Sequence, residues 1–316
     1  MKRSVLKKIQ SNREEITCGA GIGIDCAMLS YGERKIALST ETVSGSSFKV
    51  CRYAIHRALN NAAASGAVPV AVMLSFMLPE GAEESELKEL MNQAAEVCRQ
   101  ENIQIIGGHT EVTPAVKEKV VTAVGIGERA CGVDIYQGSA KPGQDIVVSK
   151  WIGLEGSARI ANEYAGKLAA RYPERMIEEA EGFTKFLSVI PEAATAVKSG
   201  VCAMHDASQG GIFAALWELA ESAGVGLEVD LKKLPVRQET IEICEFFELN
   251  PYEISSAGCL LMTTEDGVGL TSVLQKEGIP AVIVGRTTAG NDRVLFNEDE
   301  KRFLEPPKAD QMYNIN

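Results

Sequence analysis

The sequence lacks the features that would place the chain in a membrane or on a nucleic acid. No apolar run approaches the roughly 20 residues that span a bilayer. The basic N-terminal segment MKRSVLKKIQSNREE is not followed by the apolar stretch of a signal peptide. Lys and Arg number 32 against 43 Asp and Glu, a net charge of −11. Because phosphate contacts need Lys and Arg, this charge argues against general nucleic-acid or membrane binding, and we expect a cytoplasmic protein.

The sequence also lacks the usual signatures of a Rossmann site, a P-loop or a metal cluster. No GxGxxG opens a helix after a strand, and no GxxxxGK[ST] occurs. None of the eight cysteines forms a CxxC pair, and their scatter through apolar runs indicates buried free thiols in a reducing compartment. A nucleotide bound here would therefore be held by another design.

What is present is a chain of 316 residues, with 45% hydrophobic residues and an alternation of strand and helix patterns. This length suits two domains with full cores. The turn AKPG at 140–143 and the strand pattern after it predict an α/β protein with domains at 1–140 and 141–316. Apolar spacing of three and four predicts helices at 49–65, 85–101, 156–168, 192–199, 211–222 and 271–277, and the charged segment 169–190 is also expected to be helical. Short β-rich runs predict strands at 35–39, 70–78, 103–106, 119–127, 145–149, 226–231, 258–264 and 281–286. The segment after Arg302 is expected to cross the surface.

Three segments of the N-terminal half carry candidate binding residues. In GAGIGIDCAML, Gly21 and Gly23 would let backbone N–H groups approach a phosphate, and Asp25 would bind a cation; a flexible turn is the alternative. In STETVS, Glu41 follows a predicted strand, where ligands commonly lie, although polar residues after a strand usually form just a turn. In LNNAAASGAVP, Asn60 and Asn61 lie near a helix end, and a tightly packed helix is the alternative.

Two further segments contain two of the chain's three histidines. GGHTEV follows the predicted strand IQII and places His109 beside glycines, Thr110 and an acid. AMHDASQGG places His205 and Asp206 before two glycines at the start of a helix, which is a plausible anion site. Asp206 would equally serve as a helix cap. The third histidine, His56, is interpreted as structural.

These five segments, in this order, resemble the superfamily of aminoimidazole ribonucleotide synthetase, selenophosphate synthetase, thiamine-monophosphate kinase and HypE. MHDASQGGIFAALWELAESAGVGLEV is most similar to the HypE branch. The resemblance implies a PurM-like two-domain fold, with an N-terminal four-stranded sheet that pairs in a homodimer into an eight-stranded barrel. It implies a ferredoxin-like α/β C-terminal domain, and ATP in a cleft between the domains. Mg²⁺ would be held by acidic residues of the N-terminal motifs.

The resemblance also assigns roles residue by residue. The family's paired acids fall on Ile24 and Asp25, so one acid is lost, and its Asn-Asp motif falls on Asn60 and Asn61. The implied metal ligands are Asp25, Glu41 and Asn61. The implied catalytic residues are His109, His205 and Asp206. The implied ATP-binding residues are Gly21, Gly23, Asp25, Thr40, Asn60, Gly107, Gly108, Thr110, Gly210 and Gly211.

Three functions follow from the resemblance. The first is an ATP-dependent enzyme that activates an oxygen of an unidentified second substrate by phosphorylation. The sequence ends DQMYNIN, so the terminal cysteine that accepts the carbamoyl group in HypE is not expected to act here. The second is a nucleotide-binding scaffold that works with a maturation protein, because acids are missing at Ile24 and Asn61. The third is a small-molecule kinase similar to thiamine-monophosphate kinase.

Overall fold

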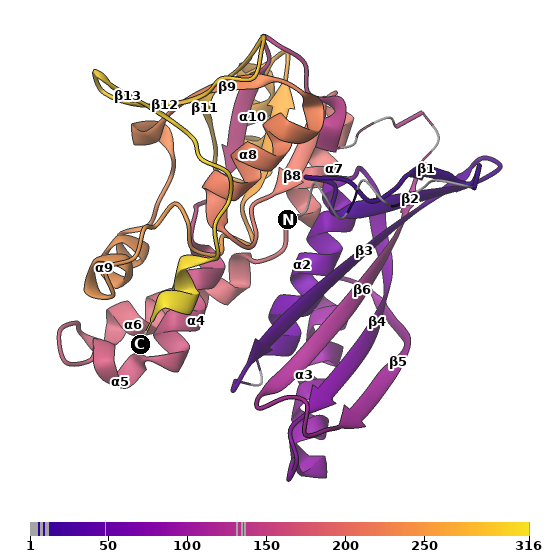
Figure 1. Cartoon of the computed structure of the whole chain (residues 1–316), viewed down its shortest axis with the longest axis vertical. Coiled ribbons are helices and arrows are strands. Elements are labelled where there is room, and N and C mark those ends of the chain that lie inside the picture. Colours follow the sequence, from indigo (N-terminus) through magenta and orange to yellow (C-terminus); the bar gives the residue numbers. More distant parts are fainter. Residues whose placement is uncertain are drawn as a thin grey trace.

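The computed structural model describes residues 6, 9, 13–47, 49–130, 132–133, 135 and 137–315. Two sheets with their own helices follow one another along the chain, and Figure 1 shows them side by side. The predicted α/β class is therefore confirmed. The described residues contain no helix that is long and apolar enough to cross a membrane.

The N-terminal sheet has six strands in the order β1-β2-β3-β6-β4-β5, two more than the resemblance implied. Their bounds are Ile16–Cys18 (β1), Cys26–Tyr31 (β2), Arg34–Gly45 (β3), Val68–Leu78 (β4), Gln104–Val112 (β5) and Lys119–Arg129 (β6). Strands β3 and β5 are longer than predicted because their backbones stay paired: β3 with β6 as far as Gly45, and β5 with β4 as far as Val112. The polar segments 39–44 and 107–112 were expected after strands, and that expectation is wrong.

Helices α2 (Val50–Ala64) and α3 (Glu84–Gln100) lie close to their predicted bounds and cover one face of this sheet. All residues of α2 except Arg52 are buried, since α2 lies between the sheet and the C-terminal domain. The small residues near its end are thus part of a tightly packed helix, as the alternative held. The opposite face of the sheet leaves apolar side chains open, with Val68 64% and Ile106 55% exposed.

The C-terminal sheet has seven strands in the order β13-β12-β9-β11-β7-β10-β8. The strands are Asp145–Ser149 (β7), Ala203–Asp206 (β8), Gly226–Asp230 (β9), Leu260–Thr264 (β10), Ala281–Thr288 (β11), Arg293–Asn297 (β12) and Glu300–Phe303 (β13). The helices are Leu154–Glu163 (α4), Ala165–Leu168 (α5), Glu174–Glu181 (α6), Ile190–Lys198 (α7), Gly211–Ala223 (α8), Gln238–Phe246 (α9) and Gly267–Lys276 (α10). The helix predicted at 156–168 is broken at Tyr164, and 169–190 is α-helical only over α6.

Helices cover both faces of the C-terminal sheet. Ile146 and Val148 of β7 pack in one core with α8, whereas Val147 between them packs in another with α7 and α10. This alternation is the period of two that a strand imposes on its side chains. A separate core joins α4, α6 and α9.

The two halves are held together by polar contacts from α2. The Asn60 amide nitrogen donates to the Leu187 carbonyl at 2.8 Å, and its oxygen accepts from the Val189 N–H at 3.0 Å. Asn60 was assigned to ATP, but its side chain here joins the two domains.

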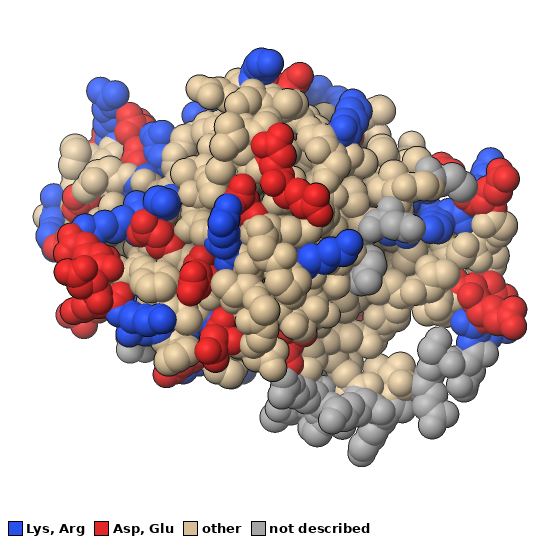
Figure 2. Space-filling model, turned by 90° about the horizontal axis from the view of Figure 1, so that it is seen from above, with Lys and Arg blue, Asp and Glu red and all other residues tan. Residues whose placement is uncertain are grey.

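On the face drawn in Figure 2, basic and acidic side chains are interspersed.

Candidate functional site

The glycine-rich loop before β2 carries Asp25 to the C-terminal domain. Gly23 has a left-handed φ of 67°, and a Cβ there would lie 2.4 Å from the backbone oxygen of Glu218 in α8. Only glycine permits this close approach. The Asp25 carboxylate consequently lies 3.4 Å from His205 Nε2, so the first and fifth candidate segments meet in space.

His205 and Asp206 end β8 and are both buried. The His205 Nδ1 is 2.8 Å from the Asp206 carbonyl oxygen, which can only accept, so Nδ1 donates. Nε2 then faces the carboxylates of Asp25, at 3.4 Å, and Glu218, at 3.7 Å. Burial opposes protonation, but these carboxylates and that of Asp206 together raise the pKa of His205 above its ordinary value.

The Asp206 carboxylate is an unusual buried group. Asp206 is only 1% exposed, and neither carboxylate oxygen has a hydrogen-bond partner among the described residues. Burial raises the pKa of Asp206 to about 8. The N-cap of α8 is Gly210, so Asp206 is not the helix cap that the alternative proposed. A buried carboxylate that accepts no hydrogen bond can bind a cation or accept a hydrogen bond from a ligand.

Glu41 reaches the same region from β3. The Asn61 side-chain nitrogen donates to Glu41 Oε1 at 2.9 Å, and burial raises the pKa of Glu41 to about 6. Glu41 lines the cavity described below, whereas Asn61 is not among the residues that line this cavity. Carboxylate oxygens from Asp25 and Glu41 are ligands that suit Mg²⁺, and Asn61 orients one of them.

A cavity of about 660 Å³ lies where these groups meet. Its volume is in the range of small-molecule sites. The N-terminal domain contributes Ile22, Asp25 and Glu41. The rest of the lining is His205, Asp206, Ser208, Gln209, Gly210, Ala214, Ala215, Trp217, Glu218 and the tail Pro306, Pro307, Lys308, Ala309 and Asp310. The cavity is thus built from both domains, and its lining combines acidic side chains with an indole and two prolines.

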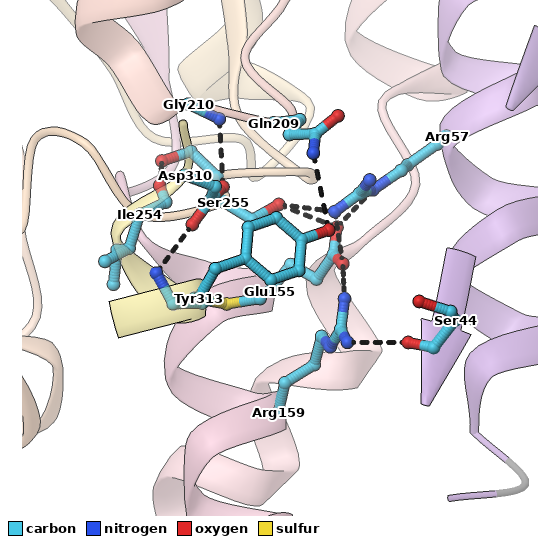
Figure 3. A network of polar contacts seen from close by, with 12 residues as sticks. Ser44, Arg57, Glu155, Arg159, Gln209, Gly210, Ile254, Ser255, Asp310 and Tyr313 are labelled. Carbon is cyan, nitrogen blue, oxygen red and sulfur yellow. Dashed lines mark hydrogen bonds and ion pairs between the residues drawn. The ribbon is translucent and has the colours of Figure 1, made fainter. Parts of the chain in front are cut away.

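The C-terminal tail forms one wall of this cavity. Asp310 is 2% exposed, and its carboxylate accepts from the Gly210 N–H at 2.9 Å and the Met312 N–H at 3.0 Å. Figure 3 shows Asp310 beside Gly210, and Tyr313 beside Gln209. The tail was expected simply to cross the surface, but its Asp310 carboxylate accepts a hydrogen bond from the Gly210 N–H at the start of α8. Sequence patterns gave no signal for this contact, because 100 residues separate its partners.

Other predicted residues lie elsewhere in the single chain. Residues 107–110 are exposed on β5, the edge strand farthest from β2, and His109 contacts Glu111 at 3.7 Å. Thr40 is exposed on β3. Gly21 forms a bridge with Ile24 in the loop that carries Asp25. The structure thus brings together the first, second and fifth segments, and not the fourth.

Comparison with known proteins agrees with this architecture. The fold is the PurM-like two-domain α/β fold. Residues 23–128 match the N-terminal domain model of AIR synthase related proteins, and residues 141–296 match the C-terminal domain model. The chain belongs to the AIR synthase-related protein family.

Several relatives share most of the chain's length. A putative hydrogenase expression/formation protein of Methanocaldococcus jannaschii is 26% identical and covers 100% of this chain and 96% of its own. The carbamoyl dehydratase HypE of Escherichia coli is 27% identical and covers 92% of this chain and 88% of its own. A HypE–HypF complex has a TM-score of 0.79 at 20% identity, covering 96% of this chain and 99% of the matched one. HypE in complex with ATP has a TM-score of 0.75 at 20% identity, covering 88% and 86%.

Proposed function

We propose that the chain is a HypE-like, ATP-dependent enzyme that activates an oxygen atom of a second substrate by phosphorylation. The observation that carries the proposal is the cavity between the domains, where Asp25, Glu41, His205 and Asp206 converge beside the glycine-rich start of α8. The names of the relatives, carbamoyl dehydratase, and the HypE structure with ATP support the same chemistry. Phosphorylation turns a poor leaving group, a carbonyl or amide oxygen, into a good one.

The phosphates of ATP fit the wall formed by the start of α8 and by Lys308. Backbone N–H groups at a helix N-terminus attract anions, and a phosphate would replace the Asp310 carboxylate that the Gly210 N–H now binds. Asp25 and Glu41 would hold Mg²⁺, with Asn61 fixing Glu41. When bound, Mg²⁺ neutralises the charge of the phosphates. Trp217 and the tail prolines offer an apolar wall for the rest of the nucleotide.

His205 and Asp206 are placed to orient the phosphorylated group or to move a proton. Nε2 of His205 is directed toward Asp25 and Glu218 while Nδ1 is held by a carbonyl, so the imidazole has one fixed orientation. Asp206, with a pKa of about 8, is largely protonated at neutral pH and can donate a proton to an oxygen.

We also propose that the protein works as a cytoplasmic homodimer. The apolar side chains left open on β4 and β5 need a partner surface, and a second copy would cover them. If two copies paired at this face, residues 107–110 of one copy, which include His109, would lie nearer the cavity of the other copy. The HypE–HypF structure supports a maturation protein as a further partner.

A nucleotide-binding scaffold is the second candidate. The observation that favours it is the loss of acids at Ile24 and Asn61, which leaves fewer carboxylates to hold a metal for turnover. A scaffold would bind ATP or ADP without turnover. A kinase similar to thiamine-monophosphate kinase would instead leave phosphate on an acceptor, which product analysis detects.

Turnover of ATP by the wild type and by Asp25→Ala tests the proposal. We expect Mg²⁺-dependent phosphate release, and at least an about tenfold loss in the variant, the size of effect seen when metal sites are perturbed. The exposed Asp299, between β12 and β13, provides the matched control Asp299→Ala, with unchanged turnover. Turnover that is equal in wild type and Asp25→Ala would remove Asp25 from the mechanism, and no turnover in the wild type would favour the scaffold.

A further inference from the structure

The C-terminal tail, residues 304–315, is anchored at both ends and only loosely held between them. Leu304 is 8% exposed, and its N–H donates to the Arg293 carbonyl at 2.8 Å. Toward the other end, Met312 packs against the core that joins α4, α6 and α9. Residues 305–309, called the strap below, are exposed, and their backbone makes no hydrogen bond to another described residue. The strap can therefore move without the loss of backbone hydrogen bonds.

The strap is a wall that two cavities share. Its residues 306–309, with Gly210 and Ala214 at the start of α8, line the cavity of the proposed site and also a second cavity of about 320 Å³. Phe213 and Arg302 belong to the lining of the second cavity alone. Displacement of the strap would join the two cavities into one groove. The position of the strap thus determines how open the start of α8 is to a ligand.

Asp310 fastens the end of the strap to α8. Its carboxylate accepts from the Gly210 N–H through one oxygen and from the Met312 N–H through the other, and Figure 3 shows it beside Gly210. The carboxylate therefore supplies the negative charge that a helix N-terminus attracts. Burial raises the pKa of Asp310 above its ordinary value, which shows that this charge is less well solvated than in water. Such a contact can be displaced by a stronger anion.

The cavity beside the strap contains a separate sign of a missing ligand. Asp206 lines the same cavity as Gly210 and Asp310, and both of its carboxylate oxygens are buried without a hydrogen-bond partner among the described residues. Buried polar atoms are normally satisfied, so the cavity is incomplete while the tail is docked. This observation is independent of the helix N-terminus itself.

We propose that the tail is an autoinhibitory device, in which the Asp310 carboxylate holds the place at the Gly210 N–H that a phosphate of ATP takes. Docking of the tail at Asp310 and binding of the nucleotide then exclude each other. The inference rests on the proposed function, because it takes ATP as the ligand of this site. Leu304 stays anchored throughout, and the four residues from it to Lys308 span up to about 13 Å. Lys308 therefore remains within reach of the phosphates.

The exclusion has two measurable consequences. A docked tail lowers the apparent affinity for ATP by the fraction of molecules in which Asp310 has left α8. By thermodynamic reciprocity, bound ATP releases the tail to the same extent. A tail that only completed the fold would show neither effect.

Calorimetric titration of ATP with Mg²⁺ into the full chain tests the first consequence. We expect Asp310→Ala to bind ATP about fivefold more tightly than the wild type, or more. Asp266→Ala is the matched control, because the Asp266 carboxylate likewise accepts from a backbone N–H, that of Gly269 at 2.8 Å, at the start of α10 and does not line the cavity. It should bind ATP as the wild type does.

Hydrogen exchange in the wild type tests the second consequence and needs no variant. The amides of residues 310–315 should exchange faster with ATP and Mg²⁺, whereas adenosine, which has no phosphate, should leave them unchanged. Equal ATP affinity in wild type and folded Asp310→Ala, tail exchange that bound ATP does not accelerate, or equal acceleration by adenosine would each overturn the inference and leave ATP binding intact. No ATP binding in either protein would instead overturn the proposed function, and the inference with it.

Discussion

Arg57 of α2 and Glu155 of α4 form a buried ion pair that joins the two domains beside the cavity. Arg57 Nε donates to Glu155 Oε2 at 2.8 Å, and Nη2 donates to Oε1 at 2.7 Å. Ser255 completes the group, since its hydroxyl accepts from Arg57 Nη2 and donates to Glu155 Oε2. Figure 3 shows Arg159 on the other side of the same carboxylate. Sequence patterns offered no signal for a pair that is separated by 98 residues.

Arg57→Met should destabilise the protein strongly. The substitution leaves Glu155 buried with only Arg159, at 3.6 Å, to neutralise it. Breaking a buried pair in this way costs about 3–5 kcal/mol, because the remaining charge is uncompensated. The midpoint of urea unfolding measures the loss. Arg171 pairs with Glu245 on the surface, so Arg171→Met is the control and should leave the midpoint unchanged.

Gly211→Ala should destabilise far more than Gly224→Ala, although both glycines have left-handed φ angles at the ends of α8. A Cβ on Gly211 would lie 2.5 Å from the Tyr252 backbone oxygen, whereas nothing lies within 4 Å of a Cβ on Gly224. We expect about 3 kcal/mol or more for the first, from strain and overpacking, and about 1 kcal/mol for the second. Thermal unfolding of the two variants gives the comparison; equal losses would contradict the packing described here.

His56 should make the protein less stable in mild acid. Burial, with Arg52 and Lys150 nearby, lowers the pKa of His56 from 6.5 to about 3. Between these values the unfolded chain binds the proton and the folded one does not, so stability increases with pH and is lost as the pH falls below 6.5. His56→Gln removes this dependence, worth about 1.4 kcal/mol per pH unit. Urea midpoints at pH 7 and pH 5 should fall less in the variant; parallel falls would show that His56 does not titrate in this way.

Asp310→Ala should release the C-terminal tail from α8. The Gly210 and Met312 N–H groups lose their acceptor, which costs about 1–3 kcal/mol where the donor stays buried. Limited proteolysis should then cleave the tail near Pro306 faster than in the wild type. Asp299→Ala, on an exposed turn, is the control. Equal cleavage rates in Asp310→Ala and wild type would mean that this contact does not hold the tail.

The sequence predicted the regular helices well and the strand ends poorly. Helices α2, α3 and α8 have apolar faces with a clear helical period, and their bounds came within one or two residues of the prediction. Strands β3 and β5 continue through polar residues, because backbone pairing with β6 and β4 holds them and side-chain polarity does not. Such pairing is set by distant partners that a local pattern does not contain.

Only some of the residues named from the sequence line the cavity, and the structure adds one that was not named. Asp25, Glu41, His205 and Asp206 line one cavity, and their roles in binding and catalysis stay predictions. Glu218 was missed because it lies within a helix read only for its apolar face, and it approaches His205 through packing. Residues 107–110 lie on the far edge strand, so a role for His109 needs a second copy of the chain.

The most direct test of the central claim, that the cavity between the domains binds ATP, is calorimetric titration of ATP with and without Mg²⁺. The account predicts tight, Mg²⁺-dependent binding of one ATP per chain, weakened in Lys308→Ala and unchanged in Lys301→Ala, since only Lys308 lines the cavity. Binding that does not depend on Mg²⁺ would favour the scaffold. The absence of ATP binding, with or without Mg²⁺, would contradict the account.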